Sequence, residues 1–153
     1  MAQWPAVDFI DTLKTALEAR PNLSDVTVWS AIPGPDTDPS STITLGHKPI
    51  TGTTPFAALG AGRRDDLITI PTLVRVLRTG AGETVMKAVR DRAETIAVEL
   101  LTAVLALPNP AGVQVLFVDD VTYELDQYAA EQEGTAVRGA DLEVTFTMRI
   151  RVS

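Results

Sequence analysis

The stretch ETVMKAVRDRAETIAVELLTAVLAL, residues 83–107, has the clearest helical pattern in this chain. Its apolar residues recur in steps of three and four, at Val85, Met86, Val89, Ala93, Ile96, Ala97, Leu100, Leu101, Val104 and Leu107. This spacing puts one apolar stripe along a helix, and charged residues occupy the other side. Gly80 and Gly82 precede the stretch and Pro108 follows it, which predicts a helix over Glu83–Leu107. Such a helix has to pack on an apolar surface, and we expect a sheet to provide it.

The segment Leu142–Val152 alternates strictly between apolar and polar residues, which predicts a strand with one buried face. A second strand is predicted from Val113 to about Asp126, where apolar residues again alternate. Asp119 and Asp120 in its middle indicate a bulge or a bend. A polar connection, residues 127–134, joins the two strands. We expect them to form a hairpin that lies under the long helix.

The remaining elements precede the long helix. The pattern predicts a first helix over Ala6–Arg20 and strands at Asp25–Ala31, Thr42–Leu45 and Leu67–Arg78. Pro71 cannot donate to a ladder, so it should lie at an edge or a bulge. This order does not alternate as a doubly wound fold would. It predicts one α+β domain, residues 1–153, with a mainly antiparallel sheet and two helices packed on one face.

Residues 46–65 form the least regular piece of the chain, and Gly, Pro and Thr dominate much of it. A loop of this length in a compact domain tends to be functional. We therefore interpret it as a long irregular arm that contacts another subunit. A plain surface loop is the alternative interpretation.

Composition excludes several classes of function. The chain has 153 residues, a formal net charge of −7 and no cysteine. The acidic balance argues against general or sequence-specific nucleic-acid binding, which needs clustered Lys and Arg. The lack of cysteine excludes disulfides and thiolate metal sites. We find neither a signal peptide nor an apolar run long enough for a membrane span, so we expect synthesis in the cytoplasm and no membrane contact.

No catalytic constellation is visible in the sequence. His47 is the only histidine, and it lies in a Gly/Pro/Thr-rich segment where a surface role is the common one. Three acidic pairs could offer oxygen ligands, but none has the spacing of a calcium loop. They are Asp36 with Asp38, Asp65 with Asp66, and Asp119 with Asp120. We predict no catalytic residue, no metal, no cofactor and no enzyme activity.

The solvent-exposed face of the last predicted strand carries a charge gradient. It runs from Asp141 and Glu143 at one end to Arg149 and Arg151 at the other. A solvated sheet face is the simplest interpretation. The alternative is a surface that meets the opposite end of a neighbouring copy, because such gradients favour head-to-tail contacts.

Several runs together resemble the tail terminator proteins of long-tailed siphophages, the minor tail protein U group and its relatives in actinobacterial phages. The resemblance covers nearly the whole chain, most firmly residues 63–152, but not residues 33–62. The runs are RRDDLITIP (63–71), Gly80 and Gly82, RDRAETI (90–96), LPNPAGV (107–113) and GADLEV (139–144).

The resemblance implies an α+β subunit that forms a hexameric ring, without enzyme activity or a cofactor. Such a ring caps the growing tail tube, stops its polymerisation and offers a surface to the head-completion protein. The expected partners are therefore other copies of this chain, the major tail tube protein and a head-completion or connector protein. The expected location is the head-proximal end of the virion tail, reached from the host cytoplasm during assembly.

The arm and the solvent-exposed face of the last strand together give a candidate assembly surface. Its residues are Arg63, Arg64, Asp65, Asp66, Glu143, Arg149 and Arg151. Two other functions remain open. The first is a different head–tail connector or a tail tube subunit, which unlimited self-polymerisation would favour. The second is a small ligand-binding or enzymatic α+β domain, which a deep pocket with convergent acid and base groups would favour.

Overall fold

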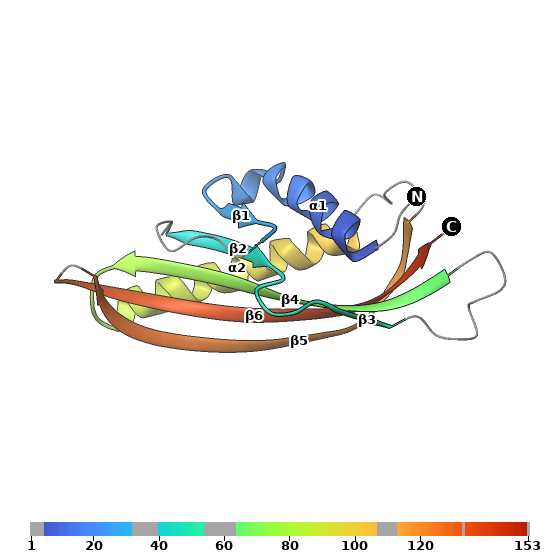
Figure 1. The fold of residues 1–153 in the computed structure, drawn as a ribbon. Coiled ribbons are helices and arrows are strands. Elements are labelled where there is room, and N and C mark those ends of the chain that lie inside the picture. The colour runs from blue at the N-terminus through green and yellow to red at the C-terminus, as the bar shows by residue number, and fades with distance from the viewer. Residues whose placement is uncertain (1–4, 32–39, 54–63, 107–112, 133, 153) are drawn as a thin grey trace.

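The computed structural model describes residues 5–31, 40–53, 64–106, 113–132 and 134–152. These residues form a mixed, mostly antiparallel sheet with two α-helices packed against it, which confirms the predicted α+β fold (Figure 1). The elements in chain order are α1 (Pro5–Glu18), the 3-10 turn η1 (Pro21–Leu23), β1 (Thr27–Trp29), β2 (Ser41–Leu45), β3 (Thr51–Thr53), β4 (Arg64–Thr79), α2 (Glu83–Leu105), β5 (Val113–Gln132) and β6 (Thr135–Val152).

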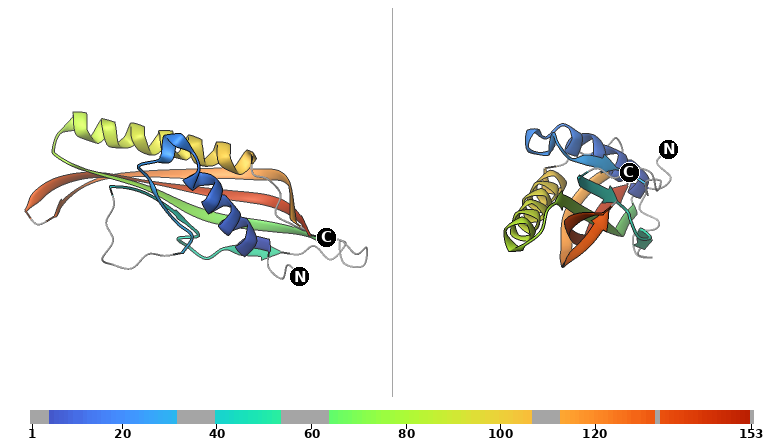
Figure 2. Two further views of the ribbon diagram at one scale, coloured as in Figure 1. Left: turned by 90° about the horizontal axis from the view of Figure 1, so that it is seen from above. Right: turned by 90° about the vertical axis from the view of Figure 1, so that its left-hand side faces the viewer.

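The described strands form one sheet with the order β1-β2-β4-β6-β5, and β3 pairs with β4 beyond the end of β2. Only β1 and β2 run parallel among these pairs. Three strands are unusually long, with 16 residues in β4, 20 in β5 and 18 in β6. They form an extended curved ribbon, and both helices lie along it (Figures 1 and 2).

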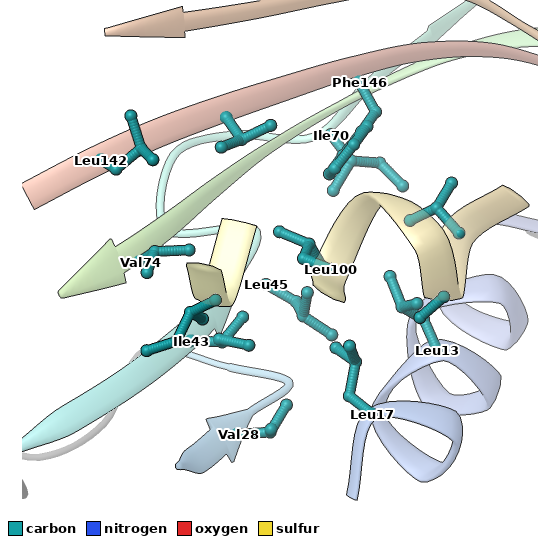
Figure 3. Close-up of a cluster of buried hydrophobic side chains, with 14 of the residues drawn as sticks. Leu13, Leu17, Val28, Ile43, Leu45, Ile70, Val74, Leu100, Leu142 and Phe146 are labelled. Carbon is teal, nitrogen blue, oxygen red and sulfur yellow. The ribbon is translucent and has the colours of Figure 1, made fainter. Parts of the chain in front are cut away.

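The apolar stripe of α2 is the centre of the core. Its buried residues are Val89, Ala93, Ile96, Leu100, Ala103 and Val104. They pack mainly on β6 and β4, where Ile70, Val74, Leu142 and Phe146 turn toward the helix (Figure 3). Contacts between α2 and β5 are few. The expectation that the helix lies on the β5–β6 hairpin is therefore wrong in part, because β4 replaces β5 beneath it.

Helix α1 extends the same core toward β1 and β2. Its buried residues Phe9, Leu13 and Leu17 belong to one cluster with the α2 stripe. Polar contacts connect the segment after α1 to the outer side of α2. Glu99 accepts hydrogen bonds from Arg20 Nε at 2.6 Å and Asn22 Nδ2 at 2.9 Å. Arg92 pairs with Asp25 at 2.6 Å, so two charged contacts fix the segment after α1 against α2.

Several element boundaries differ from the predicted ones. Helix α1 covers residues 5–18 instead of 6–20, and α2 ends at Leu105, before the predicted Leu107, which is outside the described residues. The expected polar connection over residues 127–134 is mostly strand, because Gln127–Gln132 pair with Ala140–Thr135. The predicted irregularity at Asp119 and Asp120 is confirmed by a register shift between Val118 and Asp120.

The predicted irregular arm, residues 46–65, contains regular structure in part, although residues 46–50 form neither helix nor strand. Thr51–Thr53 form β3, and β4 begins at Arg64, while residues 54–63 lie outside the described part of the chain. Pro71 of β4 faces the gap between β2 and β3. Its carbonyl accepts a hydrogen bond from Gly46 N at 2.9 Å, so the missing N–H also points to this side and leaves the β4–β6 ladder unaffected.

We expect Leu100→Asp to destabilise the fold by about 3–5 kcal/mol, because the side chain is fully buried and a carboxylate there would have no partner. Val98→Asp is the matched control, since Val98 lies on the same helix with 58 % exposure. Chemical denaturation of both variants measures the difference. Equal stability of Leu100→Asp and wild type would refute the assignment of the stripe to the core.

Candidate functional site: the polar face of the sheet and the groove beside β5

The sheet surface opposite α2, here called the polar face, carries the half-buried side chains of Asp141, Glu143, Thr145, Thr147 and Arg149 from β6. The intervening residues of β6 point to the core, as the predicted alternation required. The register places three acidic residues of β5 on the same face: Asp120 opposite Thr147, Glu124 opposite Glu143, and Asp126 opposite Asp141. The polar face therefore contains two directly opposed acid pairs, an arrangement that is unfavourable without nearby cations.

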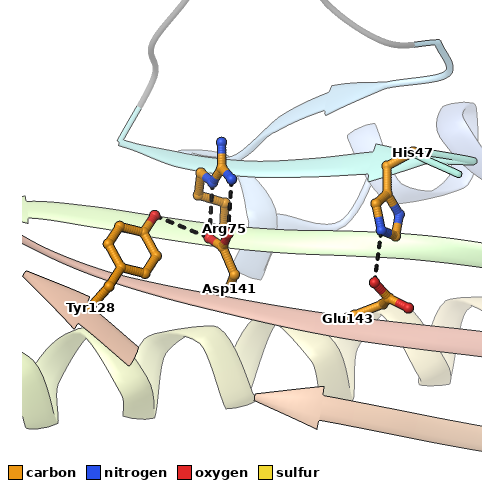
Figure 4. Close-up of polar contacts among 5 residues, drawn as sticks. All are labelled: His47, Arg75, Tyr128, Asp141 and Glu143. Carbon is orange, nitrogen blue, oxygen red and sulfur yellow. Dashed lines mark hydrogen bonds and ion pairs between the residues drawn. The ribbon is translucent and has the colours of Figure 1, made fainter. Parts of the chain in front are cut away.

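The first acid pair, Glu124 and Glu143, receives its cation from a segment distant in sequence. After β2 the chain passes over β4, and Lys48 Nζ comes within 2.9 Å of Glu143 Oε2. His47 Nε2 lies 3.0 Å from the same oxygen. Figure 4 marks this His47–Glu143 contact with a dashed line. The hydrogen bond from Lys48 holds the pKa of Glu143 below its usual value, and the bond with His47 acts in the same direction against the effect of burial. The negative charge of Glu124 also helps to raise the pKa of Lys48, after the larger effect of Glu143.

The second acid pair, Asp126 and Asp141, is compensated from β4. Arg75 binds Asp141 through two hydrogen bonds of 2.8 Å, from Nε and Nη2, in the forked geometry that suits a carboxylate (Figure 4). The Tyr128 hydroxyl of β5 donates to the same carboxylate at 3.1 Å. Burial raises the pKa of Tyr128 to about 12, and the charge of Asp141 contributes in the same direction.

Tyr128 has room for this contact because its neighbour on β6 is a glycine. Gly139 is the direct partner of Tyr128 in the ladder, and a Cβ at this position would collide with the tyrosine ring. The pair thus fixes the ring across the strand and directs its hydroxyl to Asp141.

The structure gathers most of the predicted assembly residues at one end of the ribbon. Asp65 is opposite Arg151 in the β4–β6 ladder, and Asp66 is opposite Ile150. Asp66 is buried and Arg149 half-buried, while the side chains of Arg64, Asp65 and Arg151 and the whole of Arg63 lie outside the described part. Glu143 is six residues from Arg149 along β6, roughly 20 Å, and contacts Lys48 and His47 instead. The charge of Glu143 is therefore already paired within one copy of the chain.

A second feature lies on the helix-bearing side of the sheet, where α2 leaves β5 uncovered. The α2–β5 groove has a volume of about 370 Å³. Its lining is mostly apolar, with Ala97, Val98 and Leu101 from α2 and Val121, Tyr123 and Leu125 from β5, over a floor of Leu142 and Val144. Arg90 and Glu94 of α2 also line it. Tyr123 is 79 % exposed and Leu125 is 40 % exposed, so the expectation that these residues lie under the helix is wrong.

These surfaces offer few groups for catalysis. His47 is half-buried, with its side chain 14 % exposed, and its Nε2 pairs with Glu143. Among the described residues, no serine or threonine hydroxyl hydrogen-bonds to it. No cluster of three or more His, Asp or Glu that could hold a metal ion occurs within the described ranges. Among the described helices, none has the length and apolarity that a membrane crossing requires.

Sequence reasoning missed Lys48, Arg75 and Tyr128 as members of the polar face. Arg75 and Tyr128 reach Asp141 through strand pairing, and Lys48 reaches Glu143 because the chain after β2 passes over β4. Contacts of these two kinds join distant residues and produce no local sequence pattern. The exposed position of Tyr123 and Leu125 also had no sequence signal, since alternation alone cannot tell a covered strand from an uncovered one.

Comparison with known proteins adds no relative: no protein-family model matches this chain, and no curated protein matches it.

We expect Gly139→Ala to displace the Tyr128 ring and break its bond to Asp141, at a cost of about 1–3 kcal/mol in stability from overpacking. The pKa of Tyr128 should fall from about 12 toward the ordinary value of 10.0 as the ring leaves its half-buried place. Titration of carbon-13-labelled tyrosine by NMR measures the pKa, and thermal unfolding measures stability. Gly134→Ala provides a control glycine with open space around it, although its positive φ adds a local strain of its own. A Tyr128 pKa that stays near 12 in Gly139→Ala would contradict the contact.

Proposed function

We propose that this chain is a structural tail terminator of a long-tailed phage. In this role its copies close into a ring, with the major tail tube protein on one side and a head-completion or connector protein on the other. The ring would cap the tube, stop its polymerisation and stay at the head-proximal end of the tail. The proposal starts from the family resemblance, whose runs include residues 64–71 of β4, 90–96 of α2 and 139–144 of β6, the elements that build the core.

The observation that carries the proposal is the acidic polar face. In each of its two acid pairs one member has a cation contact, Lys48 on Glu143 and Arg75 on Asp141. Within the described part of the chain, no Lys or Arg forms an ion pair with the other members, Glu124 and Asp126. A face of this kind, turned toward the channel of a ring, would repel the phosphates of passing DNA and allow it to slide. An acidic lining would therefore allow DNA to pass through the ring without binding it.

Contacts between copies are proposed at the predicted assembly surface. Along β6 the polar face changes from the acidic Asp141 and Glu143 to the basic Arg149, which lies about 20 Å from Glu143. Opposite charges at the two ends favour a head-to-tail contact, and such heterologous contacts generate either closed rings or open filaments. Closure distinguishes a terminator from a tube subunit, which would continue to polymerise.

We expect the purified chain to form a closed ring, with six copies of 16.4 kDa giving about 98 kDa. Light scattering after size-exclusion chromatography measures the mass, and negative-stain electron microscopy shows whether the particle is closed. Filaments of unlimited length would favour a tube subunit. A chain that stays monomeric at every concentration and leaves the length of tubes assembled from the major tail protein unchanged would contradict the proposal.

The combined substitutions Glu124→Lys and Asp126→Lys should convert the proposed channel lining from acidic to basic. We expect the variant to retain duplex DNA with a strong salt dependence, whereas wild type does not, because added lysines release counterions from the phosphates. Glu83→Lys with Asp91→Lys is the matched control, since both residues are exposed on α2, away from the polar face. Equal DNA retention by the two double variants would contradict a channel role for the polar face.

A further inference from the structure

Strand β5 has a long edge without a strand partner in the described sheet. It pairs with β6 on one side only, and it is the terminal strand of the sheet order. Every second residue of an edge strand directs its N–H and C=O away from the sheet, so β5 offers a row of backbone donors and acceptors. An edge of this length is commonly protected by a covering element or by charge.

The side chains along this edge differ sharply between the two faces of the sheet. On the helix side, Tyr123 and Leu125 are exposed next to Val98 of α2, and the three border the α2–β5 groove. On the polar face, Glu124 and Asp126 are exposed. The whole of β5, residues 113–132, contains five acidic residues and no Lys or Arg.

We propose that the β5 edge and the α2–β5 groove bind an extended segment of another protein in which apolar residues alternate with Lys or Arg. A strand added to β5 would complete the sheet through main-chain hydrogen bonds. Its apolar side chains would lie beside Tyr123 and Leu125 and fill the groove. Its basic side chains would fall on the polar face opposite Glu124 and Asp126, where opposite charges stabilise cross-strand pairs.

A second copy of this chain does not fit the edge equally well. An antiparallel pairing of β5 with β5 would bring two acidic, lysine-free and arginine-free strands together, and like charges across a strand pair are destabilising. This chain does contain the required alternation at Met148–Val152. That segment, however, lies in the middle of the sheet and pairs with both β4 and β5. The segment that matches both the apolar and the acidic side of β5 therefore comes from a different protein. One chain alone contains the complete site, so binding does not depend on ring formation.

The test is residue-resolved amide exchange of the full chain with a synthetic eight-residue peptide that alternates valine with lysine and arginine. We expect the β5 amides that point to the free edge, near Tyr123 and Leu125, to exchange about tenfold more slowly when the peptide is bound. Two control peptides test the sign of the charge and the alternation of basic with apolar residues. One has glutamate at the basic positions, and the other has the basic residues grouped at one end; neither should protect β5.

Tyr123→Ser with Leu125→Ser should weaken binding of the alternating peptide about tenfold or more, because it removes the apolar half of the site. Val7→Ser with Leu105→Ser is the matched control, as both residues are exposed apolar side chains outside the groove lining, and binding should be unchanged. Equal binding of the acidic peptide, absence of protection in β5, or equal losses in both double variants would overturn the proposal. Concentration-dependent protection of the same amides in the chain alone would overturn it in favour of a second copy.

Discussion

The packing of one apolar helix stripe on two strands determines the rest of this structure. An α-helix is about 10 Å across, and strands lie about 4.8 Å apart, so one helix covers about two strands. Helix α2 covers β4 and β6, and α1 extends the core over the side of β1 and β2. No described helix is left for β5, and its apolar residues Tyr123 and Leu125 stay exposed. The groove is therefore a consequence of the width of the sheet relative to its helices.

The same packing determines the charge pattern on the opposite side. Burial of Leu142 and Val144 under α2 forces Asp141 and Glu143 onto the polar face, because neighbouring residues of a strand point to opposite faces. The antiparallel register then places Asp126 and Glu124 directly opposite them. Arg75 and Lys48 offset part of the repulsion, and the remaining acidic character is what the proposed channel role uses. Core packing and surface electrostatics are thus linked through strand register.

The sequence predicted the elements with strong local periodicity. The long helix and the last strand were recognised because each repeats one simple pattern over many residues, and the bulge near Asp119 followed from two acids in an apolar run. Element ends were less accurate, since Gln127–Gln132 are held in β5 by pairing and carry little strand pattern of their own. Which strands lie under α2 could not be predicted, because alternation shows that a strand has an apolar face without showing what covers it. The contact of His47 and Lys48 with Glu143 joins residues about a hundred positions apart, so it too depended on the tertiary fold.

Helix α2 covers β4 and β6 and leaves β5 open. Residue-resolved amide exchange in the free chain is the sharpest test of this arrangement, because exchange reports hydrogen bonding at each strand separately. We expect slow exchange throughout the centre of β6, which has partners on both sides, and in the buried middle of α2 around Ile96. Along Thr122–Asp126 of β5 we expect slow and fast amides to alternate. Uniformly slow exchange along this part of β5, or fast exchange in the middle of α2, would contradict it.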